Sequence, residues 1–151
     1  MRAPLQLVVH RTDSGGHAVD LGLTVPSDLA LVGDVVDLVA KQCQGGPLPA
    51  RRVFFNLRTV LAEALTNAIT YGNGGDPSRQ VRIRVEVAAD AVRLYVTDEG
   101  EGFDADSVPD PTAPENLGRE NGRGLFVMRH LVDQVSFNEK GNGVCLTLRA
   151  H

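Results

Sequence analysis

One face of the helix predicted over residues 50–71 carries the residue types of a polar binding site. At 100° per residue, Glu63 and Asn67 share this face with Asn56, Thr59, Thr66 and Thr70. A solvated helix face usually mixes several Lys and Glu residues, whereas here Glu63 is the single charge. One carboxylate among amides and hydroxyls suits a specific polar ligand. The alternative is a neutral surface face with a helix-stabilising glutamate.

A second cluster, residues 98–103, follows directly after a predicted strand. Gly100 and Gly102 allow a sharp turn and let a ligand approach the backbone closely. Asp98, at the end of the strand, is a fixed acceptor that suits a donor such as an exocyclic amine. A calcium loop is excluded because its third and fifth positions would be Gly100 and Gly102, which lack oxygen ligands in their side chains. An acidic, glycine-rich turn without a site remains the alternative.

A third cluster, residues 121–126, stands at the predicted start of a short helix. Gly122 and Gly124 expose backbone N–H groups there, and a helix N-terminus favours an anion such as phosphate. Arg123 adds a cation, and Leu125 begins the apolar part of the helix. The chain has neither a GxxxxGK[ST] loop nor a βαβ dinucleotide fingerprint.

Periodicity predicts the elements that must position these clusters. The helix over 50–71 buries Val53, Leu57, Val60, Leu61, Ala64, Leu65 and Ala68, and a helix starting after an N-cap at Ser27 ends near Gly45. Residues 104–121 have no periodicity and suggest a linker or a lid. Strands are expected at 5–10, 19–25, 81–87, 92–96, 135–137 and 144–148, with a third helix at 125–132. This order predicts an α+β two-layer sandwich, with a mixed, mostly antiparallel sheet and helices on one face.

Composition narrows the possible functions. The chain has 151 residues, enough for one domain, and 42% of them are hydrophobic. A formal net charge of −4 argues against broad electrostatic binding to nucleic acid or to anionic membranes. No targeting or membrane-spanning segment is recognised, and Cys43 and Cys145 form no CxxC pair. We therefore expect one cytoplasmic domain over residues 1–151 with two free thiols.

Taken together, the three clusters resemble the conserved boxes of a known superfamily. Residues 63–73 (EALTNAITYGN) resemble the N box of the GHKL ATPases, residues 98–104 (DEGEGFD) their G1 box, and residues 122–128 (GRGLFVM) their G2 box. The segment 108–117 (VPDPTAPENL) matches a pattern that recurs in one subgroup. The resemblance extends over about residues 51–148 and is strongest to the anti-sigma factor serine/threonine kinases.

The resemblance implies a role for each box. Glu63 would be the general base, and Asn67 would bind Mg²⁺ and nucleotide. Asp98 would receive the adenine amino group in a pocket shaped by Gly100 and Gly102. The G2 residues Gly122, Arg123, Gly124 and Leu125 would contact the phosphates, and residues 104–121 would form the ATP lid.

The resemblance further implies an ATP-dependent kinase that binds a sigma factor and phosphorylates a STAS-domain anti-sigma factor antagonist, and that is commonly a homodimer. A partner-sequestering module with little phosphotransfer, or a switch protein with another partner, remains an alternative. The chain departs from the family pattern at Tyr71, where histidine is frequent, and at Asn142, where many relatives have threonine. We expect Tyr71 to border the apolar face, and Asn142 to form hydrogen bonds as threonine would.

Overall fold

Alternating apolar residues build a six-stranded sheet. The computed structural model describes residues 6–12, 18–101 and 120–150, and for 6–12, 18–19, 120–123 and 125 it describes the backbone alone. The strands lie in the order β1-β2-β3-β4-β6-β5, and all five pairings are antiparallel, so the expectation of a partly parallel sheet was wrong. The strands are β1 (Gln6–Thr12), β2 (Ala18–Pro26), β3 (Gln80–Val87), β4 (Ala91–Thr97), β5 (Gln134–Phe137) and β6 (Gly143–Arg149).

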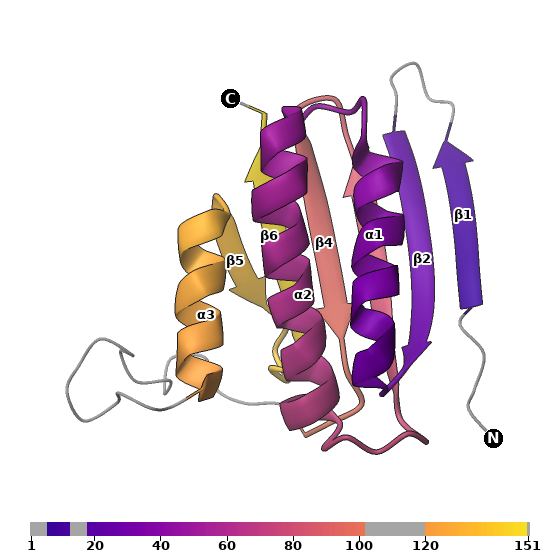
Figure 1. Ribbon diagram of the computed structural model, residues 1–151, viewed down its shortest axis with the longest axis vertical. Coiled ribbons are helices and arrows are strands. Elements are labelled where there is room, and N and C mark those ends of the chain that lie inside the picture. Colours follow the sequence, from indigo (N-terminus) through magenta and orange to yellow (C-terminus); the bar gives the residue numbers. More distant parts are fainter. Residues whose placement is uncertain (1–5, 13–17, 102–119, 151) are drawn as a thin grey trace.

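The described helices all lie on one face of this sheet (Figure 1). The 3₁₀ turn η1 (Leu29–Leu31) leads into α1 (Val32–Cys43), and α3 (Glu120–Leu131) stands near β5. The middle helix is longer than α2 itself (Arg58–Asn67), because the π-type turns η2 (Arg52–Leu57) and η3 (Ala68–Gly72) continue it at both ends. The expected α+β two-layer architecture is confirmed.

The core lies between the helices and the sheet. Every apolar residue predicted for the inner face of the middle helix is buried, and Leu57, Val60, Leu61 and Leu65 are fully enclosed. On β3, Val81, Ile83, Val85 and Val87 are buried whereas Arg82 and Arg84 are exposed, as the alternation predicts. The hydrophobic contacts between these two layers fix the relative positions of the loops that follow α2 and β4.

Two predicted helix starts were wrong. Ser27 is not the N-cap, because its hydroxyl donates to the Arg79 carbonyl and accepts from Asn73; Asp28 accepts from the Ala30 N–H instead. Helix α3 begins at Glu120, not at Leu125, so Gly122 lies in its first turn and Gly124 in its interior. Of the lid predicted over 104–121, residues 104–119 lie outside the described residues.

Two further expectations concern the cysteines and the membrane-spanning segments. Cys43 and Cys145 are both free thiols, as expected. Over the described ranges, no helix combines the length and the hydropathy that a bilayer span requires.

Candidate functional site

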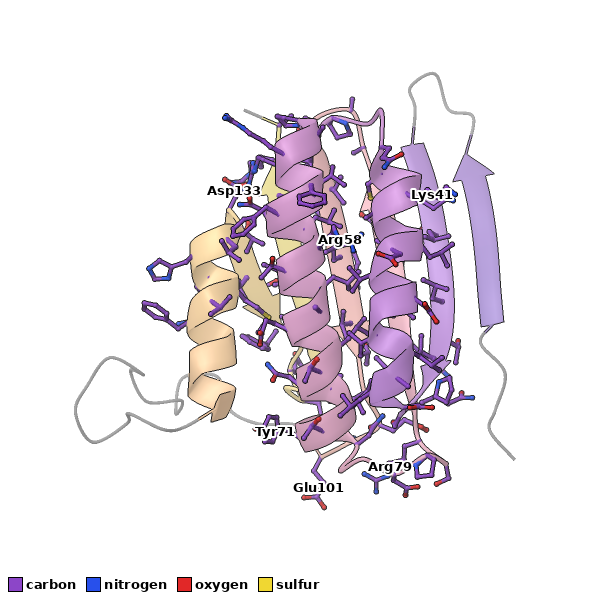
Figure 2. The ribbon with its side chains drawn as sticks, viewed as in Figure 1. Lys41, Arg58, Tyr71, Arg79, Glu101 and Asp133 are labelled. Atoms are coloured by element: carbon purple, nitrogen blue, oxygen red, sulfur yellow. The ribbon has the colours of Figure 1, made fainter. Side chains whose placement is uncertain are left out.

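A cavity of about 520 Å³ opens between the C-terminal end of the middle helix, the end of β4, α3 and the β5–β6 turn. This volume is in the range of pockets that hold small organic ligands. Tyr71, Arg79 and Glu101 belong to its lining and gather at the end of the molecule where the middle helix ends (Figure 2). The rest of the lining comprises Ala64, Asn67, Ala68, Gly72, Gly74, Val96, Asp98, Met128, Phe137, Gly141, Asn142, Gly143 and Val144.

Asp98 is one of two carboxylates in the lining of this cavity, the other being Glu101, and apolar side chains belong to the same lining. Val96, Met128 and Val144 belong to the same lining and offer apolar surface. Burial of Asp98 raises the pKa of its carboxyl above the ordinary 3.8, and a hydrogen bond from the Gly100 N–H partly opposes this rise. That N–H donates to Asp98 Oδ1 at 2.7 Å. A carboxylate among apolar walls suits a flat, mostly apolar ring that carries a donor group.

Two glycines allow the backbone to approach Asp98. A Cβ on Gly72 would lie 2.1 Å from Asp98 Oδ2, and a Cβ on Gly100 would lie 2.0 Å from the Gly72 carbonyl oxygen. Neither glycine has a positive φ, so the space rather than the backbone conformation requires glycine at both positions. The end of the middle helix and the loop after β4 are therefore in direct backbone contact at the cavity.

Glu63 and Asn67 lie one helical turn apart on α2, and helix α3 crosses them at Gly124. A Cβ on Gly124 would lie 2.8 Å from Asn67 Nδ2 and 3.3 Å from Glu63 Oε2. Asn67 lines the cavity, whereas Glu63 lies a turn farther along the same face and outside its lining. The structure thus brings together residues of the predicted N and G2 boxes, 57 positions apart between Asn67 and Gly124.

The polar face of the middle helix is explained by this packing. At the other end of α3, Asn56 Nδ2 donates to the Leu131 carbonyl oxygen at 2.8 Å. Contacts at Gly124, in the interior of α3, and at Leu131, its last residue, hold α3 along the face that carries Glu63 and Asn67. At Asn56, Glu63 and Asn67 the polar face is therefore partly covered by α3.

A comparison of the whole sequence decides the family. The sequence profile of the histidine kinase-like ATPase domain matches residues 25–150, which is most of the chain. The chain belongs to the histidine kinase-like ATPase domain family. This confirms the resemblance that the three boxes indicated.

Relatives of this histidine kinase-like ATPase domain include serine-protein kinases and anti-sigma F factors. A serine-protein kinase RsbW of Oceanobacillus iheyensis is 30% identical over 92 residues, covering 56% of this chain and 58% of the relative. The RsbW of Bacillus subtilis is 32% identical over 99 residues, covering 61% of this chain and 62% of the relative. An anti-sigma F factor of Geobacillus kaustophilus is 37% identical over 100 residues, covering 63% of this chain and 67% of the relative. The similarity thus spans about 58% to 67% of these relatives' lengths.

Membership of the histidine kinase-like ATPase domain family implies that the chain binds ATP. The donor chemistry at Asn67 also fits Mg²⁺, which is usually held by one or two protein oxygens together with substrate phosphates and waters. Asn67 supplies one amide oxygen on the cavity wall. Among the described residues, no group of three or more His, Cys, Asp or Glu side chains could hold a metal ion by itself. A nucleotide would therefore have to supply most of the ligands of an ion held there.

The remaining predicted site residues of this histidine kinase-like ATPase domain lie in the loop after β4 and in α3. Gly100 is buried beside Asp98 and Gly72, and Gly102 lies outside the described residues. Gly122, Arg123 and Leu125 belong to the first half of α3, where only the backbone is described.

Several residues of the cavity escaped the sequence analysis. Tyr71 is 49% exposed and lines the cavity together with Ala64 and Ala68 of the predicted apolar face, a role that the sequence analysis did not assign to it. The π-type turn η3 shifts residues after Asn67 away from the 100° positions of a regular helix, and a helical wheel cannot reveal this. Met128, expected in the core, is 4% exposed and also contributes to the cavity wall. Arg79 has no signal in the local sequence pattern.

Proposed function

We propose that this protein is an ATP-dependent protein serine/threonine kinase and an anti-sigma factor. In this role it binds a sigma factor and phosphorylates a STAS-domain anti-sigma factor antagonist in the cytoplasm. The names of the relatives, serine-protein kinase and anti-sigma F factor, support the two activities. The antagonist, and a homodimeric state, are carried over from the resemblance of the three boxes.

The observation that carries this proposal is the relative position of Glu63, Asn67 and Asp98. The first two share one face of α2, with Cβ atoms about 5–6 Å apart as expected for residues four apart. Asp98 lies in the cavity that Asn67 also lines. A nucleotide whose base reaches Asp98 therefore has its phosphates directed toward the Asn67 end, where Glu63 and Gly124 lie.

In the proposed reaction, the hydroxyl oxygen of a substrate serine or threonine attacks the γ-phosphorus of ATP. The bond from that phosphorus to the β,γ-bridging oxygen breaks, and ADP leaves. The Glu63 carboxylate accepts the hydroxyl proton, and the product is a phosphoserine or phosphothreonine ester. Mg²⁺ held at Asn67 would neutralise phosphate charge. The remaining contribution of the chain is to position the nucleotide and the base.

The decisive experiment mixes the purified chain with ATP, Mg²⁺ and a STAS-domain protein from the same genome. We expect one phosphoryl group per antagonist, detected by intact mass, and slower transfer when ADP competes. ATP binding without any transfer would contradict the kinase and favour a module that sequesters its partner. Co-purification with a sigma factor tests the second activity, and light scattering tests the homodimer.

A further inference from the structure

The peptide group between Asp98 and Glu99 is held by two asparagine side chains from different parts of the chain. The Asp98 carbonyl oxygen accepts from Asn142 Nδ2 at 2.8 Å, and the Glu99 N–H donates to Asn73 Oδ1 at 2.8 Å. Both groups belong to one planar peptide unit. Asn73 directly follows η3, and Asn142 lies in the β5–β6 turn. The segment after η3 and the β5–β6 turn therefore bind the same peptide group, one at its N–H and the other at its carbonyl oxygen.

The orientation of the Asn142 amide follows from its neighbour Asn138. Asn138 Oδ1 accepts from the backbone N–H groups of Gly141, Asn142 and Gly143, at 2.8, 3.1 and 3.1 Å. Its Nδ2 therefore faces Asn142 Oδ1, at 2.8 Å. This leaves the Asn142 Nδ2 for the Asp98 carbonyl oxygen, so the reversed amide would break two hydrogen bonds.

The orientation of the Asn73 amide is determined in the same way. Asn73 Nδ2 donates to Ser27 Oγ at 2.9 Å and to the Gln80 carbonyl oxygen at 3.0 Å. The Gln80 carbonyl oxygen can only accept a hydrogen bond, so it must face Asn73 Nδ2. Asn73 Oδ1 therefore faces the Glu99 N–H. Asn73 is 1% exposed, and these three hydrogen bonds compensate the burial of its polar group. The Glu99 carboxylate also accepts from the Gln80 N–H, which fixes the loop at a further point.

We infer that Asn73 and Asn142 are positioning residues that direct the Asp98 carboxylate and thereby select a base with an exocyclic amine. The inference rests on the proposed ATP site. The Asp98 N–H donates to the Asn142 carbonyl oxygen at 2.9 Å, so hydrogen bonds hold the peptide groups on both sides of the Asp98 Cα. The Gly100 N–H donates a hydrogen bond to Asp98 Oδ1. Oδ2 is then the atom that we assign to the amine of adenine.

The test compares the affinities of the full chain for ATP and for ITP, in which a carbonyl replaces the amine. In Asn142→Ala we expect the Kd for ATP to rise about 5- to 10-fold, as for the loss of one hydrogen bond, and the Kd for ITP to change less than about 2-fold. Asn56→Ala is the matched control. It removes a 2.8 Å bond of the same type, from Nδ2 to the Leu131 carbonyl, about 16 Å along the helix from Asn67.

A second variant tests the other end of the peptide. In nucleotide-free Asn73→Ala we expect the Glu99 amide proton to exchange faster with solvent, measured by NMR, and the preference for ATP over ITP to fall. Because Asn73 is buried, this variant could fail to fold, in which case Asn142→Ala decides alone.

The outcomes separate this inference from the proposed function. If the wild-type chain prefers ATP and Asn142→Ala keeps that preference, the positioning role is wrong and the ATP site stands. If both nucleotides weaken equally in Asn142→Ala, Asn142 supports the fold only, which also overturns the inference. A wild-type chain that binds neither nucleotide, or both equally, overturns the proposed base recognition and the positioning role together.

Discussion

Gly72 approaches Asp98 so closely that a Cβ on Gly72 would lie 2.1 Å from Asp98 Oδ2 and 2.3 Å from Asp98 Cγ. The last residue of η3 and the first residue after β4 are therefore packed without space for a side chain. We expect Gly72→Ala to displace the Asp98 carboxylate from the cavity and to weaken ATP binding by at least about tenfold. Isothermal titration measures this change.

The matched control for this substitution is Gly33→Ala. Gly33 lies in α1, has no positive φ, and has no neighbour within 4 Å of an added Cβ. We expect this variant to bind ATP as the wild type does and to gain about 0.5–1 kcal/mol of stability from its higher helix propensity. Equal ATP affinity in the wild type and Gly72→Ala would show that the close approach is not needed for binding.

Glu63→Gln is expected to slow transfer strongly while keeping the nucleotide bound. Glutamine has nearly the same shape but cannot accept the hydroxyl proton, so transfer to the antagonist should slow by about 10²- to 10⁴-fold. The Kd for ATP should stay within about twofold, because Glu63 lies outside the cavity lining. Rapid-quench transfer assays and titration measure the two quantities. Glu86→Gln on the uncovered face of the sheet is the control, and a normal transfer rate in Glu63→Gln would remove Glu63 as the base.

Asn67 should carry the magnesium dependence of nucleotide binding. In the wild type we expect ATP to bind more tightly in Mg²⁺ than in EDTA, since the ion links the amide oxygen of Asn67 to the phosphates. Asn67→Ala should bring the two affinities within about twofold of each other, whereas Asn67→Asp keeps an oxygen ligand and should preserve the difference. An undiminished Mg²⁺ effect in Asn67→Ala would place the ion elsewhere.

The preference for ATP over ITP should depend on pH through Asp98. Burial raises the pKa of this carboxyl above 3.8, and only the ionised form offers Oδ2 purely as an acceptor. The preference should therefore be complete above the raised pKa and should decrease as the pH falls through it. Because both nucleotides share the same phosphates, the ratio of their affinities removes the titration of the phosphates. Asp98→Asn lacks this carboxyl, so the part of the pH dependence that the wild type shows and Asp98→Asn lacks belongs to Asp98.

The same pKa affects the free energy of unfolding of the nucleotide-free protein. The folded chain binds a proton at Asp98 at pH values where the unfolded chain has released it, so this group's contribution to stability falls as the pH rises from 3.8 through the raised value. Urea titrations at several pH values in this interval give the free energy of unfolding of the wild type and of Asp98→Asn. As the pH rises, the free energy of unfolding of the wild type should fall relative to that of Asp98→Asn. A difference of the opposite sign would mean that Asp98 is stabilised as the charged form.

Cys43 should resist thiol reagents until the protein unfolds. Its side chain is fully buried, and this burial raises the pKa of its thiol to about 11, so the reactive thiolate is about one part in a thousand at pH 8. Cys145 is partly exposed and should be modified first. In a Cys145→Ser variant, labelling of Cys43 should follow the rate of global unfolding, measured by mass spectrometry. Labelling of both thiols at similar rates would contradict this burial.

The sequence alone determined the two layers and the orientation of their faces. Alternation with a period of two predicts that Ile83 and Val85 point inward, and the helical period predicts the same for Leu57 and Leu61; all four are buried. These patterns are local, since each depends on residues within one strand or a few helical turns. The pairing of Glu63 with Asn67 on one face is local in the same sense.

The tertiary structure decided how the separate segments meet. No local sequence pattern predicts three of the contacts at the site. These are the contact of Gly72 with Asp98, the packing of Gly124 on Asn67, and the hydrogen bonds of Asn73 and Asn142 to one peptide group. Asn73 and Glu99 are 26 residues apart, and Asn142 and Asp98 are 44 apart. Such contacts depend on strand order and on the shifted register of η3, which are set only when the hydrophobic layers pack. The sequence therefore contained the chemical groups of the site, and the packing of the two layers determined their geometry.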